Sequence, residues 1–178
     1  MRDTARFSLL ILGLISCLAG CSTTPRAHFR DSFRRAFSIQ DGEIQRIQFY
    51  LSHDVLLRTK ALPEDNLESA DRSVLIRAGT PGVARSTGPD WIRISFEETR
   101  ATVAFVTRPD DGHDGYYLGT ILPHQEGLHR VADMEEPQVW YDSRRYDVVE
   151  GADTALIVDA DALRALANRR QVIEGREQ

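Results

Sequence analysis

The clearest structural signal in this chain is the stretch Trp91-Ile92-Arg93-Ile94-Ser95-Phe96, in which isoleucine and phenylalanine alternate with arginine and serine. Successive side chains of a strand point to opposite faces, so the alternation predicts a strand with Ile92, Ile94 and Phe96 on one face. A second apolar stretch, Thr102-Val103-Ala104-Phe105-Val106, follows a short polar connection and predicts the antiparallel neighbour of the first.

Further short runs with strand character lie on both sides of this pair. Turn residues separate them and no long helical pattern does, which argues against a parallel sheet. We therefore expect an α+β fold that is mainly antiparallel β, either a small barrel or a sandwich. Residues 78–82 are interpreted as a hairpin turn between two of these runs, and residues 61–73 as a loop. The expected strands are 55–58, 74–77, 83–86, 116–122, 139–141, 146–149 and 155–158.

Helices are expected near the two ends of the domain. Phe29, Phe33 and Phe37 recur every fourth residue within 27–37, among several arginines, and so predict an N-terminal helical segment with one aromatic stripe. That stripe faces either the core of the domain or an anionic membrane surface. Residues 38–41 resemble a capping box, which predicts that helix continues over 43–51.

A C-terminal helix is predicted beyond the last strand. Asp159 or Asp161 can cap its first turn, because a short carboxylate accepts hydrogen bonds from the free N–H groups of that turn. Leu163, Leu166 and Ala167 have the spacing of a buried helical face.

The composition places the chain among ordinary globular proteins and excludes several functional classes. Of its 178 residues, 42% are hydrophobic and 28% are charged, as in a typical folded domain. The net charge of -5 argues against a nucleic-acid-binding protein that acts through bulk positive charge. Two cysteines are too few for a disulfide framework or a four-thiolate zinc site.

The N-terminus has the pattern of a secretory signal. Arg2 and Arg6 precede an apolar stretch over 7–18, which is shorter than the roughly 20 residues needed to span a bilayer. This stretch ends in Leu18-Ala19-Gly20-Cys21, followed by polar residues. Here the chain resembles the bacterial lipoproteins, whose lipobox has this pattern. The resemblance implies removal of residues 1–20, a diacylglyceryl thioether on Cys21 and acylation of the new amino group.

The resemblance also implies an organisation and a location. Residues 1–20 are the signal peptide, 21–27 a lipidated tether and 28–178 a single β-rich globular domain. Several acyl chains together hold a protein durably on a bilayer. Ser22 differs from the aspartate that signals inner-membrane retention in the enterobacterial pattern, so we expect the outer membrane, facing the periplasm. Cys17 leaves with the signal, so thiol catalysis and disulfides are not expected.

No pattern in the sequence establishes a catalytic, cofactor or metal site. Asp110-Asp111-Gly112-His113-Asp114-Gly115 clusters oxygen ligands suited to a hard cation, but its spacing is not that of an EF-hand and its residues are typical of a hairpin loop. His124 and His129 lie beside Pro123 and Gly127, in a segment interpreted as a loop and not as a metalloprotease helix. Ser52-His53-Asp54 contains the residue types of a triad, although neighbours in sequence do not make that geometry.

Aromatic side chains in or beside the expected strands can form either a binding surface or part of the core. They are Trp91, Trp140, Tyr116, Tyr117, Tyr141 and Tyr146.

Together these features predict a membrane-anchored envelope lipoprotein with a non-catalytic periplasmic domain that binds a partner or has a structural role. The expected partners are the membrane through the lipid on Cys21, and an envelope protein, cell-wall material or a lipid. No nucleic-acid partner is expected. One alternative is a lipoprotein subunit of an envelope assembly or secretion machine. Another is a metal-dependent hydrolase centred on His113, His124 or His129.

Overall fold

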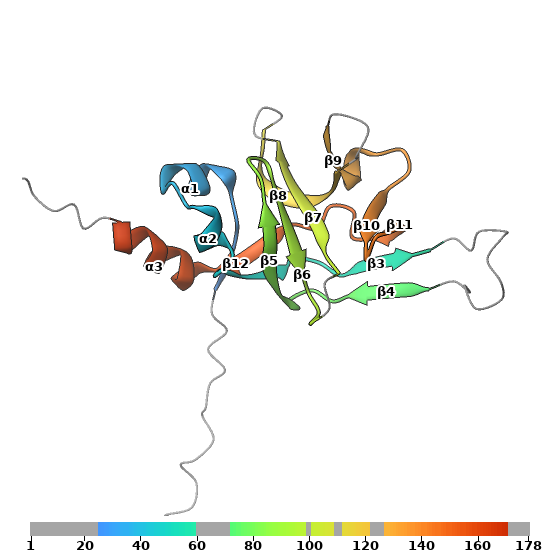
Figure 1. Ribbon diagram of the computed structural model, residues 1–178, viewed down its shortest axis with the longest axis horizontal. Helices are drawn as coiled ribbons and strands as arrows, with labels where there is room; N and C mark the ends of the chain where they lie inside the picture. The colour runs from blue at the N-terminus through green and yellow to red at the C-terminus, as the bar shows by residue number, and fades with distance from the viewer. Residues whose placement is uncertain (1–24, 60–71, 99–100, 109–111, 122–126, 171–178) are drawn as a thin grey trace, which may run out of the picture.

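The computed structural model describes residues 25–59, 72–98, 101–108, 112–121 and 127–170. Within these residues the backbone forms two antiparallel sheets (Figure 1). The larger sheet has the strand order β1-β12-β2-β5-β6-β7-β8-β9, and the smaller has the order β10-β11-β3-β4. The strands are β1 (Arg26–His28), β2 (Gln48–Leu51), β3 (Val55–Arg58), β4 (Ser73–Ile76), β5 (Pro81–Thr87), β6 (Trp91–Ser95), β7 (Val103–Arg108), β8 (His113–Ile121), β9 (Leu128–Arg130), β10 (Gln138–Tyr141), β11 (Arg144–Glu150) and β12 (Leu156–Asp159).

The helices are short and lie apart from the smaller sheet. Figure 1 shows them gathered at one side of the larger sheet, with β3, β4, β10 and β11 at the other. The predicted fold class is confirmed: the protein is α+β and mainly antiparallel β, with helices near both ends of the domain. The helices are α1 (Asp31–Ala36), α2 (Asp41–Ile44) and α3 (Ala160–Arg170), with a 3-10 turn η3 at Val131–Asp133.

The alternation in β6 builds the core, as predicted. Ile92 lies beside Phe105 of β7, and Phe105 lies beside Leu118 of β8. All three side chains are fully buried. Because faces alternate along a strand, Arg93 and its cross-strand neighbour Ala104 lie on the opposite face of the sheet.

The larger sheet curls so that β8 contacts the residues that flank β1 and β12, at the opposite edge of the same sheet. An isolated bridge joins Tyr117 to Ala155, next to β12. The N–H of Leu118 donates to the carbonyl oxygen of Thr154 at 2.7 Å. A second bridge joins Arg30 to Gly115. One continuous core therefore lies inside the curled sheet.

The predicted N-terminal helix over 27–37 is wrong in its first half. Residues 26–28 instead pair with β12 as β1, so the ordered sheet begins within the range predicted as tether. Phe29 follows β1 and is fully buried. The centroid of its ring lies 5.3 Å from the centroid of the Phe49 ring. Phe33 and Phe37 lie on and beside α1 and pack against the core. The aromatic stripe therefore faces the core of the domain.

The predicted helix over 43–51 is also wrong. Helix α2 ends at Ile44, and the chain then forms strand β2. Buried Phe49 and Leu51 alternate with more exposed neighbours, so the strand period prevails over the helical spacing of Ile44, Ile47 and Leu51. The capping box lies two residues later than predicted, between Gln40 and Glu43.

The two strands predicted to flank residues 78–82 exist, but they do not form a hairpin. Strand β4 pairs with β3 in the smaller sheet, whereas β5 pairs with β2 and β6 in the larger one. The chain therefore passes from the smaller to the larger sheet between β4 and β5. This connection is held against β2, because the N–H of Gly79 donates to the carbonyl oxygen of Leu51 at 2.9 Å. Of the predicted loop 61–73, residues 61–71 lie outside the described residues.

The predicted C-terminal helix is confirmed as α3. Asp159 caps it, since its carboxylate accepts hydrogen bonds from the N–H groups of Asp161 and Ala162. Leu163 and Leu166 pack against the core, as their spacing predicts.

Candidate functional site

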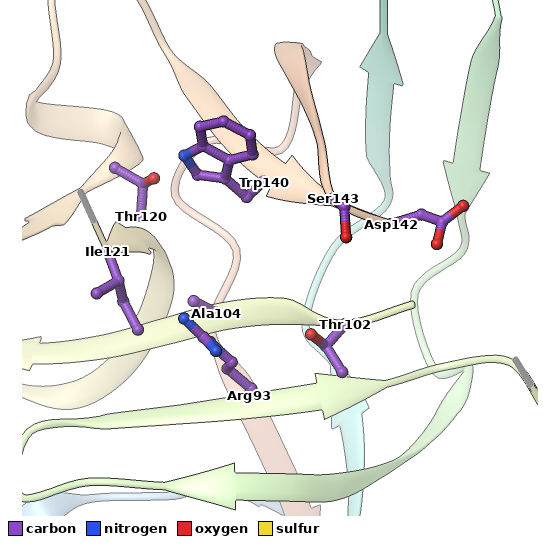
Figure 2. Close-up of a pocket in the computed structure, with 8 residues that line it drawn as sticks. All are labelled: Arg93, Thr102, Ala104, Thr120, Ile121, Trp140, Asp142 and Ser143. Carbon is purple, nitrogen blue, oxygen red and sulfur yellow. The ribbon is translucent and has the colours of Figure 1, made fainter. Parts of the chain in front are cut away.

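A pocket of about 350 Å³ opens between the larger sheet and the turn that joins β10 to β11. Figure 2 shows side chains of β6, β7 and β8 on one side of it and those of the β10–β11 hairpin on the other. Its wall combines an indole, a guanidinium, hydroxyl groups and two apolar side chains, with an aspartate at its edge. The lining residues are Arg93, Thr102, Ala104, Thr120, Ile121, Trp140, Asp142 and Ser143.

Trp140 provides the largest apolar surface of the pocket. Its side chain points away from the core, because its neighbours Val139 and Tyr141 in β10 are the buried ones. It remains 43% exposed, which is unusual for a large apolar side chain in this domain. An exposed indole that borders a hollow provides a flat face for packing and an N–H for a hydrogen bond.

Arg93 provides the positive charge of the pocket. Among the described residues, its guanidinium makes no hydrogen bond and no ion pair. It lies 5.4 Å from the centroid of the Trp91 ring, a cation–π contact that leaves its N–H donors available. A guanidinium presents N–H donors in a planar fork that matches a carboxylate or a phosphate, so Arg93 can bind an anion.

Asp142 and Ser143 form the turn between β10 and β11 in a strained conformation. Their φ angles are 47° and 61°, and both therefore lie in the left-handed region. Two-residue hairpins with positive φ at both positions usually have asparagine and glycine there. Serine has no special preference for this region, and its Cβ makes the conformation costly by about 1 kcal/mol. The turn thereby places Asp142 and Ser143 at the pocket, where the Ser143 hydroxyl points toward Thr102 and the Asp142 carboxylate points away from the other lining side chains (Figure 2).

A buried tyrosine fixes the position of this hairpin. The hydroxyl of Tyr141 donates a hydrogen bond to a carboxylate oxygen of Glu97, which follows β6. Its ring also meets that of Tyr146 edge to face at 5.7 Å. Burial and the neighbouring Glu97 carboxylate raise the pKa of Tyr141 above its usual range. Because Tyr141 precedes the turn directly, these contacts hold the pocket wall in place.

A second polar cluster joins α1 to β8, far from this pocket along the strands. The hydroxyl of Tyr116 donates to Asp31 at 3.1 Å and accepts from Arg34 at 3.0 Å. Arg34 also donates to the carbonyl oxygen of Gly88 at 2.8 Å. Burial, opposed in part by Arg34, raises the pKa of Tyr116 well above its usual range. Since each of these groups has a protein partner, the cluster is best explained as a buried link between α1, β8 and the β5–β6 turn.

The structure does not bring the described candidate histidines together. His113 begins β8, whereas His129 lies on β9 beside Thr120, seven positions further along β8. At about 3.3 Å per strand residue, this register separates the two backbones by roughly 23 Å. His129 belongs to a strand and not to the predicted loop, and His124 lies outside the described residues. Among the described part of the chain, no group of three or more His, Cys, Asp or Glu residues is placed to hold a metal ion.

The remaining candidates have structural contacts. Gly112 has a φ of 77° in the β7–β8 connection, which agrees with the predicted hairpin loop, although residues 109–111 lie outside the described ranges. Ser52 Oγ lies 2.9 Å from His53 Nδ1 and also accepts the N–H of Ala155. The carboxylate of Asp54 accepts the N–H of Ala78, and within the described ranges Asp54 makes no hydrogen bond with His53.

Sequence reasoning identified only part of the pocket. Trp140 was one of the aromatic candidates, but Tyr116, Tyr141 and Tyr146 are buried in the core. The alternation in 91–96 indicates Arg93 only as a residue on the polar side of a strand. Arg93 lies on the outward face of its strand, and only folding of the chain brings this face to the same pocket as Trp140.

Comparison of the chain with family models, curated proteins and solved structures found no match. Cys21 lies outside the described residues. In the described residues there is no helix with the length and apolar composition needed to cross a bilayer.

Proposed function

We propose that this protein is a membrane-anchored envelope lipoprotein whose domain binds a small polar ligand, without catalysis, in the pocket between β6–β8 and the β10–β11 hairpin. The anchor is the lipid on Cys21, which the lipobox resemblance implies. It holds the domain on the periplasmic side, with the outer membrane as the expected location.

One observation carries the binding role: the pocket joins an exposed indole, Trp140, to a guanidinium, Arg93, that has no ion-pair partner among the described residues. Ligand pockets in proteins combine apolar walls with a few polar groups that fix the orientation of the ligand. Exposed tryptophan and arginine side chains are also enriched where binding energy is concentrated. Neither side chain contributes to the core, because strand alternation turns both of them outward, toward the pocket.

The position of the pocket fits an anchored binding protein. The described chain begins beside β12 and the helices, whereas β10 and β11 lie at the other side of the larger sheet (Figure 1). A tether that enters at the first side leaves the pocket open to the surrounding compartment.

Protection of an introduced thiol tests this proposal. Under the proposal the mature chain has no free thiol, because Cys17 is removed and the Cys21 sulfur is alkylated. Ser143→Cys places one thiol at the pocket, and Ala36→Cys places one on the exposed end of α1 as a matched control. Both are labelled with a maleimide, first in intact envelopes and then after purification of the full-length acylated protein and removal of small molecules.

We expect the thiol at position 143 to react several-fold more slowly in envelopes than in the purified protein, while the thiol at position 36 reacts equally in both. The ratio of the labelling rate in envelopes to the labelling rate in the purified protein is then lower at position 143 than at position 36. An equal ratio at the two positions would overturn the binding role of this pocket.

A further inference from the structure

We infer that the ligand of this pocket is a pyranose sugar that carries one anionic group. This inference rests on the proposed function and adds the chemical class of the ligand. It follows from three features of the pocket: a flat apolar face, a free cation beside it, and hydrogen-bonding groups at the far end.

The flat face fits a sugar ring. One side of a pyranose presents C–H groups, while its edge carries hydroxyl groups, so the ring is apolar on its face and polar around its rim. Trp140 offers an indole face with an N–H at its edge, and Ile121 and Ala104 extend the apolar surface. A flexible alkyl chain would bury more area in a deeper, wholly apolar cavity, and the hydroxyl-rich wall of this pocket does not provide one.

The cation fits an anionic substituent. Arg93 extends toward the Trp140 end of the pocket in Figure 2, and its N–H groups have no ion pair among the described residues. A guanidinium binds a carboxylate or a phosphate through two parallel hydrogen bonds, which gives both affinity and orientation. A sugar that lies on Trp140 would place a substituent of one edge within reach of these donors.

The far end of the pocket fits the opposite edge of the sugar. Asp142 and Ser143 lie at this end, beside Thr102 and away from Arg93 (Figure 2). The hydroxyl groups of Ser143 and Thr102 both donate and accept hydrogen bonds, so this pair suits neutral sugar hydroxyls. The separation of Asp142 from Arg93 leaves the guanidinium charge available for the anion. The two ends therefore favour a ligand that is anionic on one edge and hydroxylated on the other.

Carboxylated and phosphorylated sugars share this chemistry, and a fluorescence titration distinguishes them. The chain has two tryptophans, so the Trp91→Phe variant leaves Trp140 as the only indole. The full-length acylated variant in detergent is titrated with N-acetylmuramic acid, with N-acetylglucosamine 1-phosphate and with neutral N-acetylglucosamine. The emission of Trp140 reports the binding of each sugar.

We expect at least one anionic sugar to change the Trp140 emission saturably, and to bind at least about tenfold more tightly than the neutral sugar. Arg93→Gln removes this preference for the anion, whereas Arg46→Gln, an exposed arginine outside the pocket, leaves it unchanged. Preference for the carboxylated or the phosphorylated sugar identifies the anionic group. Trp140→Ala, followed by calorimetry, abolishes binding of all three sugars.

Two outcomes overturn this inference. Equal binding of neutral and anionic sugars contradicts the role of Arg93. Absence of binding by every sugar, while the thiol at position 143 is still protected in envelopes, shows that the pocket binds a ligand of another class. If that thiol is not protected either, the proposed function fails together with the inference.

Discussion

The carboxylate of Asp114 in β8 accepts two hydrogen bonds from Ser32, one from its N–H at 2.7 Å and one from its Oγ at 2.6 Å. Ser32 lies in the first turn of α1, where backbone N–H groups have no partner within the helix. The side chain that caps this helix therefore comes from a strand 82 residues away in sequence. These two hydrogen bonds hold α1 against the larger sheet.

Removal of the Asp114 charge should destabilise the domain in a pH-dependent way. Burial alone raises the pKa of Asp114, but the two bonds from Ser32 and the charges of Arg30 and Arg35 outweigh it and lower the pKa below its ordinary value of 3.8. A lowered pKa in the folded state gives stability that is present above pH 3.8 and is lost as the pH falls through the folded-state pKa.

We expect Asp114→Asn to lower the free energy of unfolding by about 1 kcal/mol at pH 7, with the difference from wild type shrinking on acidification below pH 3.8. Urea unfolding at a series of pH values measures this. Asp153→Asn, an exposed aspartate, is the control and should have little effect. An Asp114→Asn effect that is independent of pH would contradict the capping role.

Relief of the strain at the β10–β11 turn should stabilise the protein. Ser143→Gly removes the Cβ that disfavours a φ of 61°, so the free energy of unfolding should rise by a few tenths to about 1 kcal/mol. Ser143→Ala loses the same hydroxyl but keeps the Cβ, and it should give no such gain. Thermal unfolding of the two variants measures the difference. Equal melting temperatures would show that the turn is not strained in solution.

The Tyr141–Glu97 hydrogen bond should support both stability and the pocket. Tyr141→Phe leaves the ring in place but removes the donor, and we expect it to cost about 1–2 kcal/mol. The pKa of Tyr141 is raised above its ordinary value of 10.0, so the unfolded chain releases this proton first and wild-type stability falls as the pH rises above 10.

In Tyr141→Phe this alkaline loss should be smaller. Chemical unfolding at pH 8 and above pH 10 measures it, and Tyr50→Phe, whose ring lies under Arg26 instead, is the control. A variant that loses stability at alkaline pH as steeply as wild type would contradict the role assigned to Tyr141.

The lipid anchor makes a separate prediction. Cys21→Ala should abolish fatty-acid labelling and release the protein from sedimented membranes, because no other site for these acyl chains is expected. Metabolic labelling with palmitate and membrane fractionation measure both effects. Unchanged labelling of the variant would refute Cys21 as the modified residue.

Local patterns predicted the parts of the fold that depend on strand period. The alternation in 91–96 identified β6 and its buried face, because one residue pattern satisfies both strand geometry and burial. The segment 43–51 was ambiguous, since Ile44, Ile47 and Leu51 have helical spacing while Phe49 and Leu51 have strand spacing. Phe49 pairs with residues of β5 and β12, and this pairing favours the strand over the helix. The local sequence does not reveal such long-range pairing.

The pocket was beyond prediction for a related reason. Arg93 and Trp140 are far apart in sequence, and each belongs to a different sheet. Their common pocket depends on how the smaller sheet packs against β6, β7 and β8, and no local pattern in the sequence specifies that packing. A local cluster of histidines can be recognised in a sequence. A guanidinium and an indole that line one pocket only in the folded chain cannot.

Photo-crosslinking in the native envelope, from a residue of the pocket wall, tests ligand binding in this pocket most directly. A photoreactive phenylalanine analogue replaces Ile121 at the pocket or, as a control, Ala36 on α1. Both variants keep the signal peptide and Cys21. We expect an adduct from position 121 that disappears when Arg93→Gln is added, and no such adduct from position 36. The absence of any adduct from position 121, or one that Arg93→Gln leaves unchanged, would contradict ligand binding in this pocket.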